Sequence, residues 1–345
     1  MSANTYCNPR IHIEDIGIYE EIEGSITFPG SNKLTTLEIK LKTNRLAEAA
    51  LLNKKIKFYL NEGSWDTVPM FIGYIKDATA TDTTMSIKAY DARCYLTGEY
   101  SKTLVLDDMH NYDGYTLAGF LKSYIDEHIN TEETIINTDY INDTNPPVCL
   151  IDYRDDGASP YDIVLAAIRD ASDTSDTFNI FNYEIVMENT VDEPYLKFKK
   201  QLPLDSTASI SLSYGDGIQS YQYTKNKIPN TVQIGDIKVD WGGEKNRVAA
   251  KKVRLYMKDE GDRTVSTALI ANQALKGLKK LREDKYEINV NVTKGAYIQT
   301  GQLVYLNVDE EIKGNHRLIS KKISFTPDSL KTSFKLNCDR YSGSY

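Results

Sequence analysis

Apolar and polar residues alternate in two stretches of the chain, residues 35–91 and 284–339. The first opens with LTTLEIKL and the second with KYEINVNV, and in both the apolar residues recur at every second position. A period of two is that of a β-strand with one buried face. Three further strands are predicted in the same order, because NKKIKFYL matches TGQLVYLN and the two strands of residues 71–91 match those of residues 317–339.

The spacing of these predicted strands agrees as well. The intervals are 17 residues from Ile39 to Ile56 and 31 from Ile56 to Ile87, against 15 from Ile288 to Leu303 and 31 from Leu303 to Phe334. Connection lengths vary freely among unrelated sheets, so four strands in one order and spacing indicate that one antiparallel β-barrel-like module occurs twice. Any two all-β segments share a period of two, and this simpler explanation stays open.

We assign the first module to residues 1–100, where IEDIGIYEEIEGSITFPG supplies the opening strands. The second module takes residues 206–236 together with 284–345, and SISLSYGDGIQSYQYTKNKIPNTVQIGD, residues 209–236, opens it. Within the first module, NRLAEAALLN predicts a short helix built on Ala and Leu. The fold class is therefore mainly β, with two barrel modules in one chain and α+β inserts.

Residues 101–205 change period and predict a small α+β domain. One helix, capped by Asp113 or Thr116, has an apolar face made of Leu117, Phe120, Leu121, Tyr124 and Ile125. A second helix starts at Ser159 and Pro160, with Asp162 as in a capping box. NIFNYEIVMEN and PYLKFKKQL then alternate around TVDE, which predicts a hairpin.

Residues 237–283 are predicted to be a helix-containing insertion in the second module. The helix is TVSTALIANQALKGLKKLRED, with apolar anchors at Leu269, Leu275, Leu278 and Leu281. Its Lys and Arg residues at 276–282 lie where the C-terminal end of a helix dipole favours cations. A solvated face and a nucleic-acid contact are the two interpretations of this cluster.

Charge is distributed unevenly along the chain. The net charge of −8 argues against nucleic-acid binding through a basic face. Residues 101–205 contain seven Lys and Arg and 21 Asp and Glu, a net −14, so the remainder holds 34 basic and 28 acidic residues, a net +6. The acidity therefore belongs to the segment between the two modules.

The chain contains no run that approaches the roughly 20 apolar residues needed to cross a bilayer, and MSANTYCNPR lacks the apolar stretch of a secretion signal. We expect a protein that is made and kept soluble inside a cell. Its four cysteines have no CxxC spacing and no neighbouring His, which predicts reduced thiols rather than a disulfide framework or a zinc site. They are Cys7, Cys94, Cys149 and Cys338.

Catalytic patterns are weak. The histidines have no HExxH or metal-ligand spacing, and His12 fits an ordinary strand position in RIHIEDI. The four are His12, His110, His128 and His316. GDG at 215–217 and WGG at 241–243 lack the Lys and Ser or Thr of a phosphate-binding loop, so turns are expected there.

The acidic residues add little chemistry. Asp170, Asp173 and Asp176 could offer oxygens to Ca²⁺, but their spacing is not that of an EF-hand and such runs also end helices. Asp155-Asp156-Gly157 fits a turn, and 49 acidic residues always offer candidate glycosidase pairs. The sequence therefore predicts no catalytic, metal-binding or cofactor-binding residue, and a protein that is not an enzyme.

Three segments carry a resemblance to a known family. SPYDIVLAAIRDASDTSDTFNIFNYEIVMENTVDEPYLKFKK joins a predicted helix to a hairpin, GDGIQSYQYTKNKIPNTVQIGD leads into the second module, and IQTGQLVYLNVDEEIKGNHRLISKKISF lies in its closing part. In this order they resemble the central baseplate hub proteins of tailed bacteriophages, the T4/Mu-type family, and their relatives in phage-like tail machines. The resemblance covers nearly the whole chain, but it transfers no individual residue, because that family works through shape and symmetry.

The resemblance implies tube-protein-like modules and a homotrimer that places six of them in a ring. Such a ring would adapt a hexameric tail tube or distal tail protein to a trimeric spike protein. It would leave a channel for the tape-measure protein and for DNA. An acidic channel wall would let DNA slide through without specific binding. The implied location is the virion tail baseplate, assembled in the host cytoplasm without membrane insertion.

Other functions stay open. A carbohydrate-binding or receptor-binding tail-tip protein would line an exposed groove with aromatic side chains. A cell-wall hydrolase would need a facing carboxylate pair, and the chain has no spare segment with such a pattern. A tube or distal tail protein would share the barrel module but usually has one copy of it.

Overall fold

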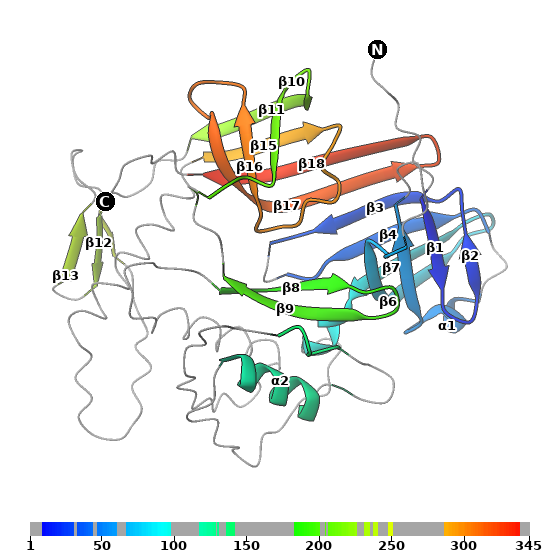
Figure 1. Cartoon of the computed structure of the whole chain (residues 1–345). Coiled ribbons are helices and arrows are strands. Elements are labelled where there is room, and N and C mark those ends of the chain that lie inside the picture. Colours follow the sequence, from blue (N-terminus) through cyan, green and yellow to red (C-terminus); the bar gives the residue numbers. More distant parts are fainter. Residues whose placement is uncertain are drawn as a thin grey trace, which may run out of the picture.

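One continuous sheet of 13 strands organises the protein, in the order β16-β10-β11-β15-β18-β17-β3-β4-β7-β6-β5-β1-β2. Figure 1 shows it running from the N-terminal strands in blue to the C-terminal strands in orange and red. The chain is mainly β, as the sequence predicts. The computed structural model describes residues 9–30, 33–43, 47–60, 67–97, 117–128, 130, 136–141, 183–200, 204, 206–225, 231–234, 237–240, 248–250 and 286–338.

The N-terminal unit is an open set of seven strands in which every neighbouring pair is antiparallel. Alternating apolar side chains, such as Ile11, Ile39 and Phe58, meet in one buried core. The strands are β1 Arg10–Ile13, β2 Gly17–Tyr19, β3 Glu23–Phe28, β4 Thr36–Leu41, β5 Lys55–Tyr59, β6 Phe71–Ala80 and β7 Met85–Asp91.

The C-terminal unit is a six-stranded barrel, which closes because β16 pairs with both β10 and β17. Its core includes Ile288, Leu306 and Phe334. The sequence predicts an antiparallel barrel, whereas this one is mixed, because β10 runs parallel to β11 and to β16. The strands are β10 Ile210–Tyr214, β11 Gly217–Lys225, β15 Tyr286–Val292, β16 Leu303–Asn307, β17 Gly314–Thr326 and β18 Ser329–Cys338.

Only one closed barrel is present among the described residues, where the sequence predicts two. In the N-terminal unit β1 lies beside β5, where β10 lies beside β16 in the barrel, but the first pair is antiparallel and the second parallel. However, the other side of β1 pairs with β2, and no pairing joins these two strands to β3 within the described structure. The N-terminal strands therefore form an open sheet with the same central strands as the barrel.

The predicted repetition of four strands is confirmed by their order and register. The neighbours β4, β7, β6 and β5 correspond to β15, β18, β17 and β16. The strands of the two units pair in the same register, and both units carry a β-bulge at the same place, after Ile75 in β6 and after Leu318 in β17. The equivalence extends to a fifth strand, because β3 pairs with β4 as residues 220–225 of β11 pair with β15.

The remaining elements lie outside these two units or connect their strands. The short helix predicted in the first module, the first helix of the acidic segment and its hairpin are all present. Residues 231–234, which the sequence assigns to the second module, lie in a separate three-stranded sheet. The elements are α1 Glu48–Leu51, the 3-10 helix η1 Ala92–Leu96, α2 Leu117–His128, β8 Tyr183–Asn189, β9 Pro194–Lys200, β12 Thr231–Ile234, β13 Ile237–Asp240 and β14 Val248–Ala250.

Two predicted helices, one starting at Ser159 and one over residues 264–284, fall outside the described residues. In the part of the chain that the structure describes, no helix has the length and apolar character needed to span a membrane.

Candidate assembly interface

The strand β17 joins the two units, because its 13 residues serve both of them. Its first half lies in the barrel, and its second half pairs antiparallel with β3, from Lys321 opposite Phe28 to Phe325 opposite Gly24. Ile323 and Phe325 thereby enter the apolar core of the N-terminal unit. The two units share one sheet at this junction, which can be followed in Figure 1, and the barrel contributes these two side chains to the core of the N-terminal unit.

An aromatic pair strengthens the junction. The rings of Phe58 and Phe325 stack with their centroids 4.8 Å apart and their planes 29° apart. Both side chains are buried. Because stacked aromatic pairs contribute about 0.5–1.5 kcal/mol beyond the area they bury, this contact ties β17 firmly to β5.

A buried lysine holds a loop against the junction. Lys321 Nζ donates hydrogen bonds to the carbonyls of Ala296 and Ile298, the latter at 2.8 Å, and lies 4.3 Å from the centre of the Phe28 ring. Burial lowers the pKa of Lys321 to about 7. The two carbonyls and the ring face favour the ammonium form and oppose that shift. Residues 293–302, which connect β15 to β16, are thereby fixed beside β17.

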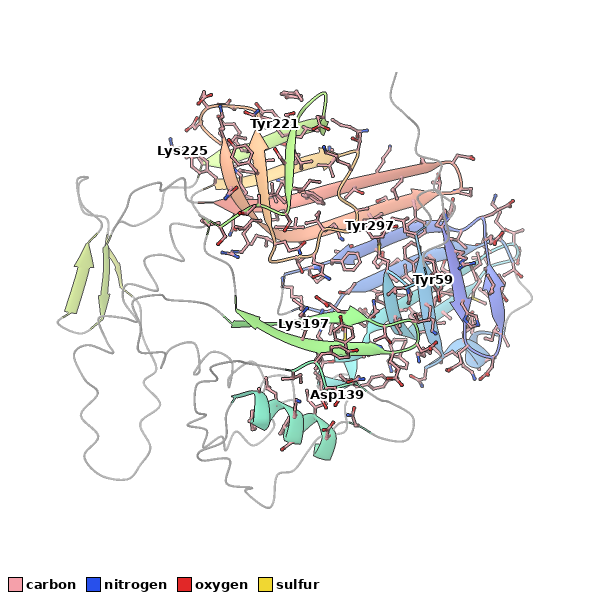
Figure 2. All side chains as sticks on the ribbon, viewed as in Figure 1. Tyr59, Asp139, Lys197, Tyr221, Lys225 and Tyr297 are labelled. Carbon is pink, nitrogen blue, oxygen red and sulfur yellow. The ribbon has the colours of Figure 1, made fainter. Side chains whose placement is uncertain are left out.

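The same loop reaches the N-terminal unit directly. The hydroxyl of Tyr297 donates a hydrogen bond of 3.0 Å to the carbonyl of Leu60. Figure 2 shows Tyr297 where the two units meet. This bond joins residues 237 positions apart in the sequence, so the relative placement of the units is fixed by side chains as well as by strand pairing.

The hairpin of the acidic segment docks on the N-terminal unit. Lys57 Nζ on β5 donates to the carbonyl of Val191 and to Asp192 Oδ1, both at 2.9 Å. Lys57 also holds the pKa of Asp192 below its usual value, through the hydrogen bond first and the charge second. Asn189 Nδ2 donates to the carbonyls of Pro69 and Met70. These contacts set the position of β8 and β9 beside the first unit.

A cavity of about 410 Å³ lies between the hairpin and both units. Tyr195, Tyr297 and Glu188 contribute to its walls, and the Tyr195 hydroxyl donates to Glu188 Oε2 at 2.6 Å. Arg93, also in the wall, forms a buried ion pair of 2.7 Å with Asp91. The walls therefore combine ring faces with hydrogen-bonding groups, an arrangement that can hold a small polar molecule.

A row of tyrosines follows β11 on the barrel. Tyr221 lies 5.5 Å from Tyr214 and 6.4 Å from Tyr223, measured between ring centroids, and Tyr223 lies 6.2 Å from Tyr286. At the end of the row, Glu311 accepts hydrogen bonds from the hydroxyls of Tyr223 and Tyr286 and from Lys225, whose region is seen in Figure 2. Tyr214 is 60% exposed. The row is thus an ordered and partly exposed aromatic surface, of a kind common at protein interfaces.

The structure places three of the groups considered from the sequence. His12 lies exposed on β1, in an ordinary strand position as predicted. His316 is buried on β17, where its Nε2 lies 2.6 Å from the carbonyl oxygen of Ile312 and burial lowers its pKa to about 4. Gly215 and Gly217 have φ of 77° and 96°, so GDG is the predicted turn, between β10 and β11.

Most of the other candidates fall outside the part of the chain that the structure describes. His110, residues 155–157, Asp170, Asp173, Asp176 and residues 241–243 lie outside the described residues, and His128 ends α2. No group of three His, Cys, Asp or Glu side chains among the described residues could hold a metal ion. Cys94 is a buried free thiol, and burial raises its pKa to about 12.

Lys321 is the junction residue that sequence reasoning missed. In SKKISF, Lys321 stands two positions before Ile323 and four before Phe325, so strand alternation puts a lysine on the same face as two core residues. That conflict between charge and period was a usable signal. The strand that pairs with this part of β17 could not be predicted, because β3 is far away in the sequence.

Comparison with family models and with curated proteins gave no match to the sequence. Solved structures do match. A tail protein from Neisseria meningitidis superimposes with a TM-score of 0.64 at 12% identity, over 96% of each chain. The 43 kDa tail protein of prophage MuSo2 from Shewanella oneidensis gives 0.60 at 13% identity, over 96% of this chain and 98% of that one.

A third match is the E. coli c3393 protein, a component of the type VI secretion system described as similar in structure to the T4 bacteriophage tail proteins gp27 and gp5. It gives a TM-score of 0.57 at 9% identity, over 97% of this chain and 78% of that one. The fold of this chain is therefore that of phage tail proteins over nearly its whole length. The resemblance predicted from the sequence is confirmed at the level of the fold.

Proposed function

We propose that this chain is a structural hub protein of a phage tail or a phage-like tail machine, and that it works as a homotrimer. Each chain contributes two related strand units, so three chains place six of them around one axis. Such a ring offers near-sixfold symmetry to a hexameric tail tube and threefold symmetry to a trimeric spike. The role is passive, because shape and symmetry perform it, and no enzymatic step is involved.

The repeated unit is the observation that carries this proposal. Five strands recur with the same register, and the two copies are joined edge to edge through β17 and β3. Head-to-tail contacts between similar units generate rings when the rotation closes. The fold shared with phage tail proteins over nearly the full length supports the same role.

The charge distribution fits a channel through such a ring. Adhesion to DNA comes largely from contacts between Lys or Arg and phosphates. With a net charge of −8 for the chain and −14 for residues 101–205, a ring of three copies would repel DNA rather than bind it. The tape-measure protein and DNA are accordingly proposed to pass through the ring, which would lie in the baseplate between tube and spike.

The mass of the protein in solution tests this proposal. Size exclusion with light scattering should give three times the 39.0 kDa of one chain, about 117 kDa. Electron-microscopy class averages of the same sample should show a ring with threefold symmetry and a central opening. A stable monomer at high protein concentration, or an assembly with an even number of copies, would contradict the hub.

The cavity beside the junction favours one second candidate, a carbohydrate-binding or receptor-binding tail-tip protein. Its walls offer the rings of Tyr195 and Tyr297 together with the carboxyl group of Glu188, which suits a sugar. Binding of the isolated protein to a glycan array, lost on Tyr195→Ala and retained on Tyr214→Ala, would favour this alternative. Absence of binding together with a trimeric mass would favour the hub.

A further inference from the structure

Two strand edges lack the partner that their equivalents have. By register, β6 is the equivalent of β17, and β11 is the equivalent of β3. Within the chain, β17 and β3 pair along residues 321–325 and 24–28. The equivalent strand positions, residues 78–80 of β6 and 221–225 of β11, belong to different units, and no described strand pairs with them on that side.

The first free edge belongs to β11. One side of β11 pairs with β15 as far as Lys225, whereas the other side meets β10 only at Gly217 and Ile218. Residues 220–225 thus present a row of N–H and C=O groups to which no described strand is bonded. An open edge of this kind is a template for another strand. Tyr221 and Tyr223 stand along it half-buried, their rings parallel to within 10°.

The second free edge belongs to β6. This strand pairs with β7 along one side, but its pairing with the β5 side ends at Ile75. Beyond that point, the N–H of Ala80 donates to Glu48 Oε1 of α1 at 2.7 Å. The carboxylate of Glu48 stands in for the carbonyl of a neighbouring strand, one of the ways in which proteins protect a sheet edge.

The loop that carries α1 need not prevent strand pairing. Its equivalent in the barrel, residues 293–302, lies directly beside the paired β17 and β3, where Lys321 holds it. Ala296 of that loop is part of the core that the two units share. A loop and a partner strand are thus accommodated together at the equivalent position.

We infer that β6 of one copy of this chain pairs antiparallel with β11 of a second copy. We obtain the register of this pairing by replacing each residue of the β17–β3 pair with its equivalent in β6 or β11. This register sets Ala78 opposite Lys225, Thr79 opposite Thr224 and Ala80 opposite Tyr223. The same register, carried past the end of β6 at Ala80, brings Thr81 and Asp82 of the following turn opposite Gln222 and Tyr221.

Each joint contains a position where a large side chain faces a small one. Within the chain, the large Phe325 lies opposite Gly24, which has no side chain. Between copies, the small Ala80 would lie opposite the large Tyr223, so the bulk is on the other strand. Pairing large with small across facing positions fills space without pushing the strands apart. The joint would also bury the half-exposed row of tyrosines.

This pairing supplies the contact that closes a ring. Each copy offers one β6 edge and one β11 edge, and the two are different, so the contact is head-to-tail. Three copies would then alternate three β17–β3 joints with three β6–β11 joints. The inference rests on the proposed hub for the number of copies, whereas the register of the joint comes from the strands alone.

Cysteine cross-linking tests the register. Opposite residues of an antiparallel pair have Cα atoms about 4.5–5.5 Å apart, within the range that a disulfide spans. Thr79 and Thr224 are both exposed in the protomer. In the double variant Thr79→Cys with Thr224→Cys, mild oxidation should convert most of the chain to covalent dimers and trimers on a non-reducing gel, and reductant should reverse this.

Two matched pairs serve as controls. Thr27→Cys with Lys322→Cys joins positions that face each other within the chain, so it should form an internal disulfide without raising the mass. Failure of this pair to form would overturn the register itself. Thr79→Cys with Gln219→Cys moves one cysteine five positions along β11, about 17 Å, and should cross-link at background level.

The background is a variant in which Cys7, Cys149 and Cys338 are replaced by Ser, with the buried Cys94 retained. Its solution mass is measured first. A trimeric mass with no more cross-linking at 79 and 224 than at 79 and 219 would overturn the strand pairing and leave the hub standing. A monomeric mass without cross-links would overturn both.

Discussion

Lys321 is the residue at which the junction has its clearest electrostatic cost. Its ammonium group is buried, and the groups that it contacts are two neutral carbonyls and the Phe28 ring. Burying a cation with such partial compensation lowers its pKa. The pairing of β17 with β3 therefore depends on whether this lysine is protonated.

The pH dependence of stability should reveal this lysine. The pKa of Lys321 is 10.5 in its ordinary state and about 7 in the folded protein. Between these values the unfolded chain holds a proton that the folded chain has lost, so the free energy of unfolding rises with pH. The difference in that free energy between the protein and Lys321→Met should therefore increase from pH 7 to pH 10 and be constant below pH 7.

Urea unfolding at a series of pH values measures this difference. The Lys321→Met variant keeps a flexible chain of similar length and cancels the titration of all other groups. A difference that stays flat up to pH 10 would show that the two carbonyls and the Phe28 ring keep the lysine protonated.

The repeat shows how far spacing predicts a β-structure. Equal intervals match Ile56 with Leu303, whereas the register makes Val304 the equivalent of Ile56. Leu303 and Val304 are both buried, so alternation could not distinguish them. A slip of one residue reverses the face of every side chain, and only the partner strand decides it. The parallel direction of β10 was unpredictable for the same reason, since ISLSY alternates in either direction.

The candidate interface was less predictable than the strands. Its tyrosines and Lys321 are visible in the sequence, but the junction that unites them depends on pairing between distant segments. The hairpin of residues 183–200 was predicted from its own alternation, whereas its docking on β5 depends on Lys57, an ordinary polar position in an alternating strand. Local patterns predict elements, and long-range contacts place them.

Removing Lys57 should release that hairpin from the first unit. Lys57→Ala removes both hydrogen bonds to residues 191 and 192. Because the Asp192 side chain is exposed, the loss of the ion pair should change global stability little. Hydrogen exchange of the amides of β8 and β9 should nevertheless become faster. The matched control is Lys197→Ala, whose partner Glu188 lies in the same hairpin; equal acceleration in both variants would contradict docking through Lys57.

At the scale of the whole molecule, we expect the two units to open as one cooperative body. Ile323 and Phe325 belong to β17 of the barrel and also to the core of the N-terminal unit. Regions that share a core open together in native-state hydrogen exchange. The slowest amides of β4 and of β15 should therefore report the same free energy of opening.

Phe325→Ala should uncouple the two units. Truncating a buried Phe costs about 3–5 kcal/mol, and here the loss falls on the core of the N-terminal unit. The opening free energy of β4 should then drop below that of β15 by up to this amount. Tyr297→Phe, which loses one hydrogen bond of about 0.5–1.5 kcal/mol, should leave the two values equal. Equal values in Phe325→Ala, both lowered, would show that the pairing of β17 with β3 keeps the units coupled without this side chain.

The shared junction also governs the order of events during synthesis. Gly24 and Phe325 face each other although they are 301 positions apart in the sequence. The ribosome must release nearly all of the chain before β17 can reach β3, and closing so long a loop slows folding. The N-terminal strands emerge first. Until β17 is synthesised, one side of β3 is unpaired and part of the N-terminal core is exposed. A chain that stops before β17 would therefore aggregate rather than persist as a folded half, so only complete chains would enter assembly.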